Sequence, residues 1–394
     1  MAQVSTFDAE VVPRARAEWF PVTREYVYLN HAAYTPLPTP AVEAMTDFLR
    51  KHQLGPKYEA ELLEVKEQTR RELARLINAE PEEVTYIPTT STGISLAAWS
   101  LPLRRGDNVI ICDQEYPANV YPWLMLQKKR GVRVKILPAP GGGLTAEQVA
   151  AAADRRTRVV SVSAVQFLSG FRTDLAALGR FCRENGIYFV VDAMQALGAL
   201  KIDVKAEQVD ILAAAAPKFL MGPPGIGLFY VRKELIPELE PPVVGANSVV
   251  GFSPETFMVY DLTLLPTADR FYTAQVNRPG IAGLGAVVRL FNELGPENIE
   301  RRVLRLTEIL VDELKGAGYR VLSDFEPAHR SAIVSFAPPD PLEAYQKLTA
   351  ARVVVSLRYD RARQPYIRVS PHFYNTEEEI RQVIGFLKAQ PAMG

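Results

Sequence analysis

The sequence predicts an α/β fold in which a large domain with a mostly parallel sheet precedes a smaller α+β domain. Through the middle of the chain, short apolar runs alternate with helical patterns, and this alternation is typical of βαβ units. The apolar runs are rich in Val and Ile and carry few charges, as expected for strands that helices cover on both faces. From about residue 296 the order changes to a long amphipathic helix, short strands and two more helices, which indicates an α+β unit.

The large domain is expected to contain seven strands joined by turns and helices. Each predicted strand is a short apolar run, and the helical patterns lie between these runs. The predicted strands cover residues 84–87, 108–112, 133–137, 158–162, 187–192, 210–213 and 227–231. The predicted helices cover residues 93–99, 118–129, 145–152 and 174–184.

The C-terminal part is expected to form the smaller unit. We place the boundary near residue 290, so that a large domain covers 21–290 and a small domain covers 291–394. Residues 1–20 are expected to pack with the small domain. Its predicted elements are a helix at 297–316, strands at 319–322, 332–336, 353–357 and 366–369, and helices that begin at 341 and 376.

Composition argues against several classes of function. The chain has 394 residues with 45 basic and 45 acidic side chains, and this balance argues against a nucleic-acid partner. No apolar stretch reaches the roughly 18 residues of a membrane span, and the N-terminus lacks a signal-peptide pattern. Cys112 and Cys182 stand among apolar residues, which indicates buried thiols and neither a disulfide framework nor a metal site. We therefore expect a cytoplasmic enzyme with a small-molecule substrate and no membrane partner.

Two charged residues stand near the ends of predicted buried strands. Asp192 ends the run 187–192, at the edge of an open α/β sheet where ligands bind. Lys218 follows the small apolar run 213–216 and precedes a turn rich in Gly and Pro. Desolvation lowers the pKa of a lysine and so favours the neutral amine that forms Schiff bases. The alternatives are an aspartate that caps a helix and a lysine on the surface.

Two further segments have the residue types of binding sites. Thr90, Ser91 and Thr92 precede a helical run, and hydroxyls at a helix N-terminus suit a phosphate group; the alternative is an ordinary N-cap. Arg368 lies in a predicted strand between apolar neighbours, where an inward arginine suits a carboxylate; the alternative is an exposed arginine paired with a glutamate. The glycines after Lys218 precede a strand, which argues against a dinucleotide-binding motif.

Taken in this order, the four segments resemble the class V aminotransferase family of pyridoxal phosphate (PLP) enzymes. The family includes cysteine desulfurases, selenocysteine lyases and isopenicillin N epimerase-like proteins. The resemblance extends from the Tyr-Leu-Asn-His motif at 28–31 to the Tyr-Asn-Thr motif at 374–376, so it covers almost the whole chain. It implies the PLP-dependent transferase fold of type I, PLP as the cofactor, an amino-acid substrate, and a homodimer with active sites at the interface.

The resemblance implies roles for five residues around the cofactor and the substrate. Lys218 matches the lysine that binds PLP as an internal aldimine, and Asp192 matches the aspartate that pairs with the pyridinium nitrogen. Tyr116 stands where the family stacks a side chain on the ring, a position that is histidine in desulfurases. Gln195 matches the residue that contacts the phenolic oxygen of the cofactor, and Arg368 matches the arginine that binds the substrate α-carboxylate.

The resemblance also implies how the phosphate of the cofactor is held. Thr90, Ser91 and Thr92 match the phosphate-binding turn of the family. Gln275 lies in a stretch that resembles the one reaching the phosphate of the partner subunit. We therefore expect the phosphate to contact both subunits of a dimer.

Several positions depart from the family pattern, and two more belong to a segment near the substrate. Ala215 and Pro217 stand where the family usually has two side chains that touch the phosphate. Gln166 and Phe167 stand where the family has a Ser-Asn pair near the cofactor, and this departure favours the epimerase-like branch. Asn30 and His31 belong to a segment that the family brings near the substrate, so both are expected to bind it.

These matches imply a PLP-dependent enzyme that acts at the α-carbon of an amino acid, by transamination or by β-elimination. One alternative is an isopenicillin N epimerase-like epimerase, and another is an inactive PLP-fold protein with a binding or regulatory role. The segment 358–364 contains no cysteine to accept sulfur, so we expect an enzyme that is not a thiol-dependent cysteine desulfurase. Arg358, Arg361 and Arg363 in that segment favour an anionic or carboxylate-bearing substrate.

Overall fold

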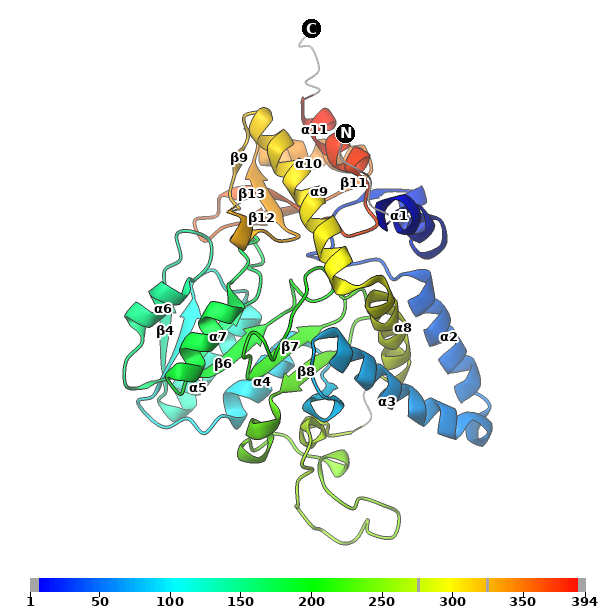
Figure 1. The fold of residues 1–394 in the computed structure, drawn as a ribbon, viewed down its shortest axis with the longest axis vertical. Helices are drawn as coiled ribbons and strands as arrows, with labels where there is room; N and C mark the ends of the chain where they lie inside the picture. Colours follow the sequence, from blue (N-terminus) through cyan, green and yellow to red (C-terminus); the bar gives the residue numbers. More distant parts are fainter. Residues whose placement is uncertain (1–6, 275–276, 324–325, 389–394) are drawn as a thin grey trace.

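The computed structural model describes residues 7–274, 277–323 and 326–388 and has a large α/β part and a smaller α+β part (Figure 1). The large part is built around a central sheet, and the small part lies at one end of the molecule around a second sheet. The helix α9 (Pro296–Gly316) runs between the two parts. The predicted fold class, an α/β protein with a mostly parallel sheet, is confirmed.

In the described part of the chain, seven strands form the central sheet in the order β2-β8-β7-β6-β5-β3-β4. Neighbouring strands are parallel, except that β8 is antiparallel to both β7 and β2. All seven predicted strands are present, and only their ends differ from the prediction. The strands are β2 (Val84–Tyr86), β3 (Asn108–Cys112), β4 (Arg133–Leu137), β5 (Thr157–Ser163), β6 (Tyr188–Asp192), β7 (Ile211–Ala215) and β8 (Gly227–Val231).

Hydrophobic clusters lie on both faces of the central sheet. Val109 and Ile111 of β3 belong to the cluster that contains Trp123, whereas Ile110 and Cys112 belong to the cluster on the other face. Successive side chains of a strand point to opposite faces, so a strand buried on both faces has no position for a charge in its middle. The helices of this region are α4 (Thr90–Ser100), α5 (Tyr121–Arg130), α6 (Ala146–Ala152) and α7 (Leu175–Glu184).

Three helices for which the sequence made no prediction pack against one another. They are α2 (Thr39–His52), α3 (Glu59–Leu76) and α8 (Arg278–Leu294). A Cβ atom on Gly285 of α8 would lie 2.2 Å from Oγ1 of Thr69 in α3, so only glycine permits this approach. The domain boundary predicted near residue 290 falls within α8, and the division into two domains stays a prediction.

The small sheet is antiparallel, with the strand order β12-β13-β10-β9. The strand predicted at 353–357 is in fact two strands: β11 (Val353–Val354) pairs in parallel with β1 (Val27–Tyr28), whereas β12 joins the small sheet. The strands of the small sheet are β9 (Arg320–Val321), β10 (Val334–Ala337), β12 (Ser356–Tyr359) and β13 (Pro365–Val369). Two helices, α10 (Pro341–Ala350) between β10 and β11 and α11 (Glu377–Lys388) after β13, share a hydrophobic cluster with these strands.

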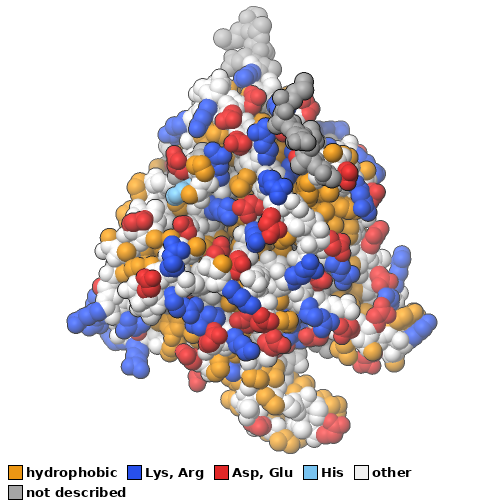
Figure 2. All heavy atoms as spheres, in the orientation of Figure 1, with side chains coloured by type: hydrophobic (Ala, Val, Ile, Leu, Met, Phe, Trp, Pro, Cys, Tyr) orange, Lys and Arg blue, Asp and Glu red, His pale blue; other side chains and the backbone are white. Residues whose placement is uncertain are grey.

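The surface shown in Figure 2 mixes basic and acidic side chains over most of its area. Hydrophobic side chains gather on a segment that protrudes below the central sheet in Figures 1 and 2. Its side chains Phe257, Met258, Tyr260 and Leu262 are all more than half exposed. No helix among the described residues combines the length and apolar character needed to cross a bilayer.

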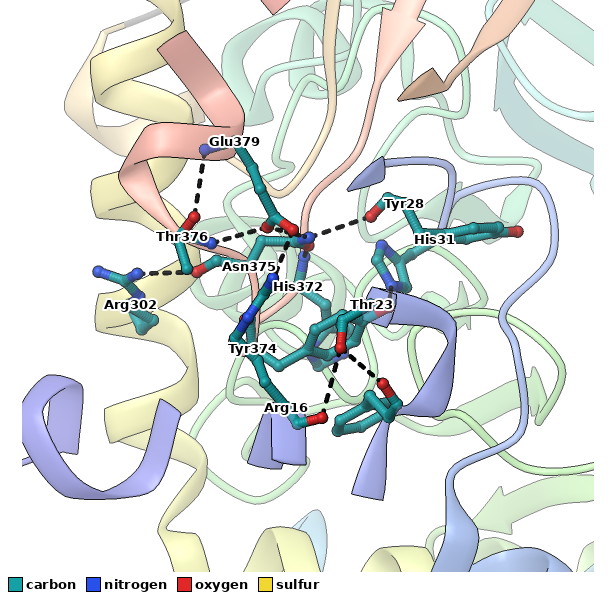
Figure 3. A network of polar contacts seen from close by, with 11 residues as sticks. Arg16, Thr23, Tyr28, His31, Arg302, His372, Tyr374, Asn375, Thr376 and Glu379 are labelled. Atoms are coloured by element: carbon teal, nitrogen blue, oxygen red, sulfur yellow. Dashed lines mark hydrogen bonds and ion pairs between the residues drawn. The ribbon is translucent and has the colours of Figure 1, made fainter. Parts of the chain in front are cut away.

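The N-terminal helical segment, which includes α1 (Val12–Arg14), packs against the C-terminal part of the chain. The ring of Phe20 stacks on that of Tyr374, with centroids 3.9 Å apart. Arg16 forms an ion pair with Glu379 at 2.8 Å, and Figure 3 shows this pair within a larger polar network. The described residues of the segment therefore contact the part with which residues 1–20 were expected to pack.

Candidate active site

The ends of two parallel strands and the start of one helix meet at one edge of the central sheet. Asp192 ends β6, and Ala215 ends β7. The N–H of Ala215 donates to Oγ1 of Thr90 at the start of α4 over 2.9 Å. Oγ1 of Thr90 donates in turn to Sδ of Met194, just after β6, over 3.3 Å. This edge therefore collects segments that are more than a hundred residues apart in the sequence.

Lys218 lies in a tight turn after β7. Its carbonyl accepts the N–H of Met221 over 2.9 Å, and its Nζ lies 5.4 Å from the centre of the Tyr116 ring. Burial, assisted by the positive charge of Arg368, lowers the pKa of Lys218 to about 8, while Asp192 acts in the opposite direction. The amine is therefore neutral far more often near neutral pH than a lysine in water.

Asp192 is a buried carboxylate with a 4% exposed side chain. Its Oδ1 accepts the N–H of Met194 over 2.9 Å. Burial raises the pKa of Asp192 to about 6, and the charge of Lys218 counteracts part of this effect. The residues that follow form turns, so Asp192 does not cap a helix.

Two buried glutamines near this edge each have one polar atom without a partner. Nε2 of Gln195 donates to the carbonyl of Ala32 over 3.1 Å, and Nε2 of Gln166 donates to Oε1 of Glu115 over 2.7 Å. The Oε1 atoms of both glutamines are buried and have no hydrogen-bond partner among the described residues. Buried polar atoms are normally paired, so each of these two oxygens has an unused capacity to accept a hydrogen bond.

Glu115 is a buried acid that sequence reasoning missed. It lies in the loop after β3, and Oε1 also accepts the N–H of Ser163 over 2.8 Å. Its Oε2 accepts the hydroxyl of Ser163 over 2.5 Å. Burial raises the pKa of Glu115 to about 7. The available signal was the same as for Asp192: an acid that closely follows a charge-free strand.

Arg368 is buried in the middle of the small sheet. It lies on β13 between its register partners Ser335 and Ser356, and its side chain is 2% exposed. Nη1 donates to the carbonyl of Phe167 over 2.6 Å, whereas Nε is buried without a partner in the described chain. Burial and the charge of Arg358 lower the pKa of Arg368 to about 9. An exposed arginine paired with a glutamate, the alternative at this position, is excluded.

The predicted group of hydroxyl residues forms the first turn of α4, and the residue before it is the N-cap. Oγ1 of Thr89 accepts the N–H of Thr92 over 3.1 Å, so the capping residue is one position before the predicted group. Thr90 is buried, Thr92 is half-buried and Ser91 is exposed. Gln275, which was expected to reach the phosphate of a partner subunit, lies outside the described residues.

His31 and Asn30 form hydrogen bonds to other residues of the protein. Nδ1 of His31 lies 2.7 Å from the carbonyl of Ser370, and Nε2 lies 2.8 Å from the hydroxyl of Tyr374 (Figure 3). A carbonyl only accepts, so Nδ1 carries the proton and Nε2 accepts from the tyrosine. Burial lowers the pKa of His31 to about 4, so the ring is neutral. Asn30 accepts a hydrogen bond from Ser356, and the arrangement leaves His31 no free nitrogen for a substrate.

The arginines of the segment 358–364 differ in their surroundings. Arg358 is half-buried and donates to the carbonyl of Leu357 over 2.9 Å. It also lies close enough to Arg368 to lower the pKa of that guanidinium. Arg361 instead forms an ion pair with Asp113 at 3.0 Å. Of these two arginines, Arg358 is the one that adds charge beside the buried arginine.

The thiols and acids offer no metal site within the described ranges. Cys112 and Cys182 are both buried, as predicted, and burial raises the pKa of each thiol. No group of three or more His, Cys, Asp and Glu side chains is placed to hold a metal ion in the part of the chain that the structure describes.

Comparisons with known proteins show extensive similarity to sulfur-processing enzymes. The chain is 29% identical to a probable cysteine desulfurase of Methanothermobacter thermautotrophicus, over 95% of this chain and 97% of the relative. The apo structure of a cysteine desulfurase from Thermococcus onnurineus NA1 superposes with a TM-score of 0.87 at 26% identity, covering 95% and 97%. The cystine C–S lyase C-DES, in complex with its product cysteine persulfide, superposes with a TM-score of 0.85 at 26% identity, covering 93% and 98%.

These similarities overturn one expectation from the sequence. The chain was expected not to be a thiol-dependent cysteine desulfurase, and that expectation is wrong, because the relatives that it resembles over nearly their whole length are named cysteine desulfurases. The expectation depended on the absence of cysteine from one loop. The match covers 97% of one of these relatives and 82% of another, so a missing cysteine in one loop does not set the chain apart from them.

The expected family, fold and cofactor are confirmed. A family model described as Aminotransferase class-V matches residues 27–383, from β1 to α11. The superposed enzymes have the type I fold, and the structure of a C-DES variant contains glycine covalently linked to its PLP cofactor, the cofactor that this family uses. The chain belongs to the class V aminotransferase family of PLP-dependent enzymes.

Proposed function

We propose that this chain is a PLP-dependent lyase that breaks the Cβ–S bond of a sulfur-containing α-amino acid. The observation that carries the proposal is the grouping of an amine, a carboxylate and a buried guanidinium within electrostatic reach of one another, namely Lys218, Asp192 and Arg368. Similarity to enzymes named cysteine desulfurase and cystine C–S lyase supports the reaction type.

The residues at this edge of the sheet fit PLP. Lys218 offers an amine with a lowered pKa to the aldehyde, and Asp192 offers a buried carboxylate to the ring nitrogen. Tyr116 is 49% exposed, so its ring is available for stacking on a bound ring. The unpartnered Oε1 atoms of Gln166 and Gln195 suit polar groups on the ring or on an attached substrate.

The phosphate group fits the start of α4. The N-terminus of a helix attracts anions through its free N–H groups and its dipole. Ser91 is exposed there and Thr92 is half-buried, so both side chains are accessible to a bound group. We propose that Thr90, Ser91 and Thr92 hold the phosphate, with Gln275 of a second copy of the chain completing the site in a homodimer.

Lys218, Asp192 and Arg368 each have a separate role in the proposed reaction. PLP, when bound, supplies an electron sink for the negative charge that develops at the substrate Cα. Lys218 holds the cofactor between turnovers and, once released, accepts the Cα proton as general base. Asp192 keeps a proton at the ring nitrogen. Arg368 holds the substrate α-carboxylate, which turns the Cα–H bond toward the amine of Lys218.

Supplying L-cysteine and L-cystine to the purified holoenzyme tests the reaction. From L-cystine we expect cysteine persulfide with equal amounts of pyruvate and ammonia. From L-cysteine we expect either sulfide with equal amounts of pyruvate and ammonia, or alanine with an equal amount of sulfur transferred to an added thiol as a persulfide. Lys218→Ala should form none of these products. Amino transfer to a keto acid without sulfur release would instead indicate transamination, and loss of chirality at Cα would indicate epimerisation. PLP bound without any turnover would indicate a binding or regulatory protein.

Borohydride reduction followed by peptide mapping tests the anchor of the cofactor. Reduction fixes PLP on the lysine that holds it. We expect the adduct on the peptide that contains Lys218, because its pKa is lowered and it lies beside Tyr116. An adduct on another lysine would contradict the assignment of the site.

A further inference from the structure

Glu115 is a buried acid for which the proposed reaction has no role. Its side chain is 7% exposed, and none of the ion pairs formed by the described residues includes it. A buried carboxylate without a cation is costly, and here it depends on three hydrogen bonds. Burial raises the pKa of Glu115 to about 7 accordingly. Packing alone does not explain why this carboxylate is buried without a cation.

The partners of this carboxylate contact the proposed active site directly. Ser163 is the register partner of Asp192 across β5 and β6. Gln166 precedes Phe167, whose carbonyl accepts the hydrogen bond from Arg368 over 2.6 Å. The buried carboxylate therefore holds a short segment that is bonded both to the strand of the ring-pairing acid and to the substrate-binding arginine.

The chemistry of the carboxylate determines which end of the Gln166 amide is presented. An ionised carboxylate has only acceptors, so Gln166 must turn its NH₂ group toward Glu115. The observed contact is Nε2 of Gln166 to Oε1 of Glu115, at 2.7 Å. The carbonyl oxygen of Gln166 is left buried and without a partner in the described chain. A ligand at this position meets an acceptor and not a donor.

We propose that Glu115 is a positioning residue that acts through Gln166. It holds the amide so that Oε1 of Gln166 accepts a hydrogen bond from an O–H or N–H group, either of bound PLP or of the amino-acid substrate. Glu115 itself touches neither ligand. The inference depends on the PLP site proposed above and adds a residue to it.

The experiment compares Glu115→Gln, Gln166→Leu and the double variant as holoenzymes. Glutamine at position 115 both donates and accepts, so it no longer dictates the orientation of the Gln166 amide. If the donor belongs to PLP, we expect each single variant to weaken PLP binding by about three- to tenfold, the worth of one hydrogen bond, and to shift the pH at which the visible band titrates. If the donor belongs to the substrate, the amino-acid KM rises by a similar factor, about three- to tenfold, and PLP binding is unchanged.

The double variant separates positioning from a general structural role. If Glu115 acts through Gln166, the double variant equals the Gln166→Leu single variant and the two effects do not add. The matched control is Glu83→Gln: Glu83 is also buried and accepts two backbone N–H groups, those of Glu80 and Lys233, each at 2.8 Å. We expect this control to alter thermal stability without changing PLP binding, the visible band or KM.

Two results would overturn the inference. Additive effects in the double variant would show that Glu115 acts independently of Gln166. Equal behaviour of Glu115→Gln and the Glu83→Gln control would leave only a structural role. Glu115→Gln could prove too unstable to isolate, and the test then depends on Gln166→Leu alone. If Gln166→Leu has the PLP affinity, the visible band and the KM of the wild type, the inference is overturned. The proposed PLP site is tested separately. If borohydride mapping of the wild-type protein finds no adduct on Lys218, the site is wrong, whatever these variants show.

Discussion

At the scale of single residues, the candidate site has more positive than negative charge. The positive charges of Arg358 and Arg368 lower the pKa of Lys218, and Arg358 lowers that of Arg368. Asp192 is the carboxylate that acts in the opposite direction at Lys218. A substrate carboxylate next to Arg368 would relieve the repulsion, which favours binding of an amino acid over an amine.

The lowered pKa of Lys218 leads to a pH-dependent prediction. Only the neutral amine reacts with the PLP aldehyde, so the rate of apoenzyme reconstitution should rise with pH and level off above about 8. Arg368→Ala removes a charge that lowers this pKa, so the midpoint should move to higher pH. Asp192→Asn removes a charge that raises it, so the midpoint should move to lower pH.

Growth of the visible cofactor band measures the reconstitution rate. The reaction of PLP with Nα-acetyl-lysine in the same buffers corrects for titration of PLP itself. A wild-type midpoint near the ordinary lysine value of about 10.4, or variants that shift in the same direction, would contradict the proposed environment of Lys218.

The buried guanidinium leads to a prediction about substrate binding. Arg368→Ala should raise the KM for the amino acid by roughly tenfold to a hundredfold, because a hydrogen bond to a charged group contributes about 1.5–3 kcal/mol. Arg368→Lys should recover only part of this, since the planar fork is lost. Arg320→Ala is the matched control, because Arg320 is an exposed arginine of the same sheet. Equal affinity of the wild type for an amino acid and its decarboxylated amine would refute the role.

At the scale of elements, the position of α4 relative to β7 sets the geometry of the site. Thr90 at the start of α4 bonds to the end of β7, and Gly93 is pressed against the sheet one turn later. A Cβ atom on Gly93 would lie 2.6 Å from Cβ of Ala213 and 2.7 Å from Cδ1 of Ile87. The close approach of the helix therefore requires glycine at this position.

Gly93→Ala should push α4 away from the sheet. We expect a loss of about 1–3 kcal/mol in the free energy of unfolding, the usual cost of overpacking, together with weaker PLP binding. Denaturant titration and PLP affinity measure the two effects. Ser95→Ala, at a half-buried position of the same helix, serves as the control and should change neither. If PLP affinity is unchanged in Gly93→Ala, the start of α4 does not bind the cofactor.

At the scale of the whole molecule, hydrophobic side chains gather on the protruding segment shown in Figures 1 and 2. Met258 is 79% exposed, Tyr260 is 87% exposed and Leu262 is 70% exposed. Contiguous exposed apolar side chains mark interaction surfaces. A second copy of the chain, in the proposed homodimer, is the partner that we propose for this segment.

Replacing both Met258 and Tyr260 with serine should weaken the proposed dimer. Sedimentation velocity should show a dimer for the wild type and a larger monomer fraction for the variant at equal concentration. Leu342→Ser is the control, because Leu342 is 54% exposed on α10, far from this segment in the sequence. A wild-type monomer at all concentrations would refute the dimer, and an unchanged dimer in the variant would place the interface elsewhere.

The sequence by itself determined the central sheet and the places of Asp192 and Lys218 at or just beyond the ends of its strands. Strands buried on both faces must lack charges in their middles, so their apolar runs are visible in the sequence, and so is a charge at or just beyond the end of such a run. These signals are local. They require only the residue and its neighbours along the chain.

Only the tertiary structure decided the hydrogen-bond partners of His31, the division of 353–357 into two strands and the burial of Glu115. The ring nitrogens of His31 are taken up by Ser370 and Tyr374, which lie more than three hundred residues away in the sequence. Val353 pairs with Val27, whereas Ser356 pairs with Arg368, so the two halves of one apolar run join different sheets. The free energy of a buried polar group depends on the partners that folding brings to it, and no local pattern contains that information.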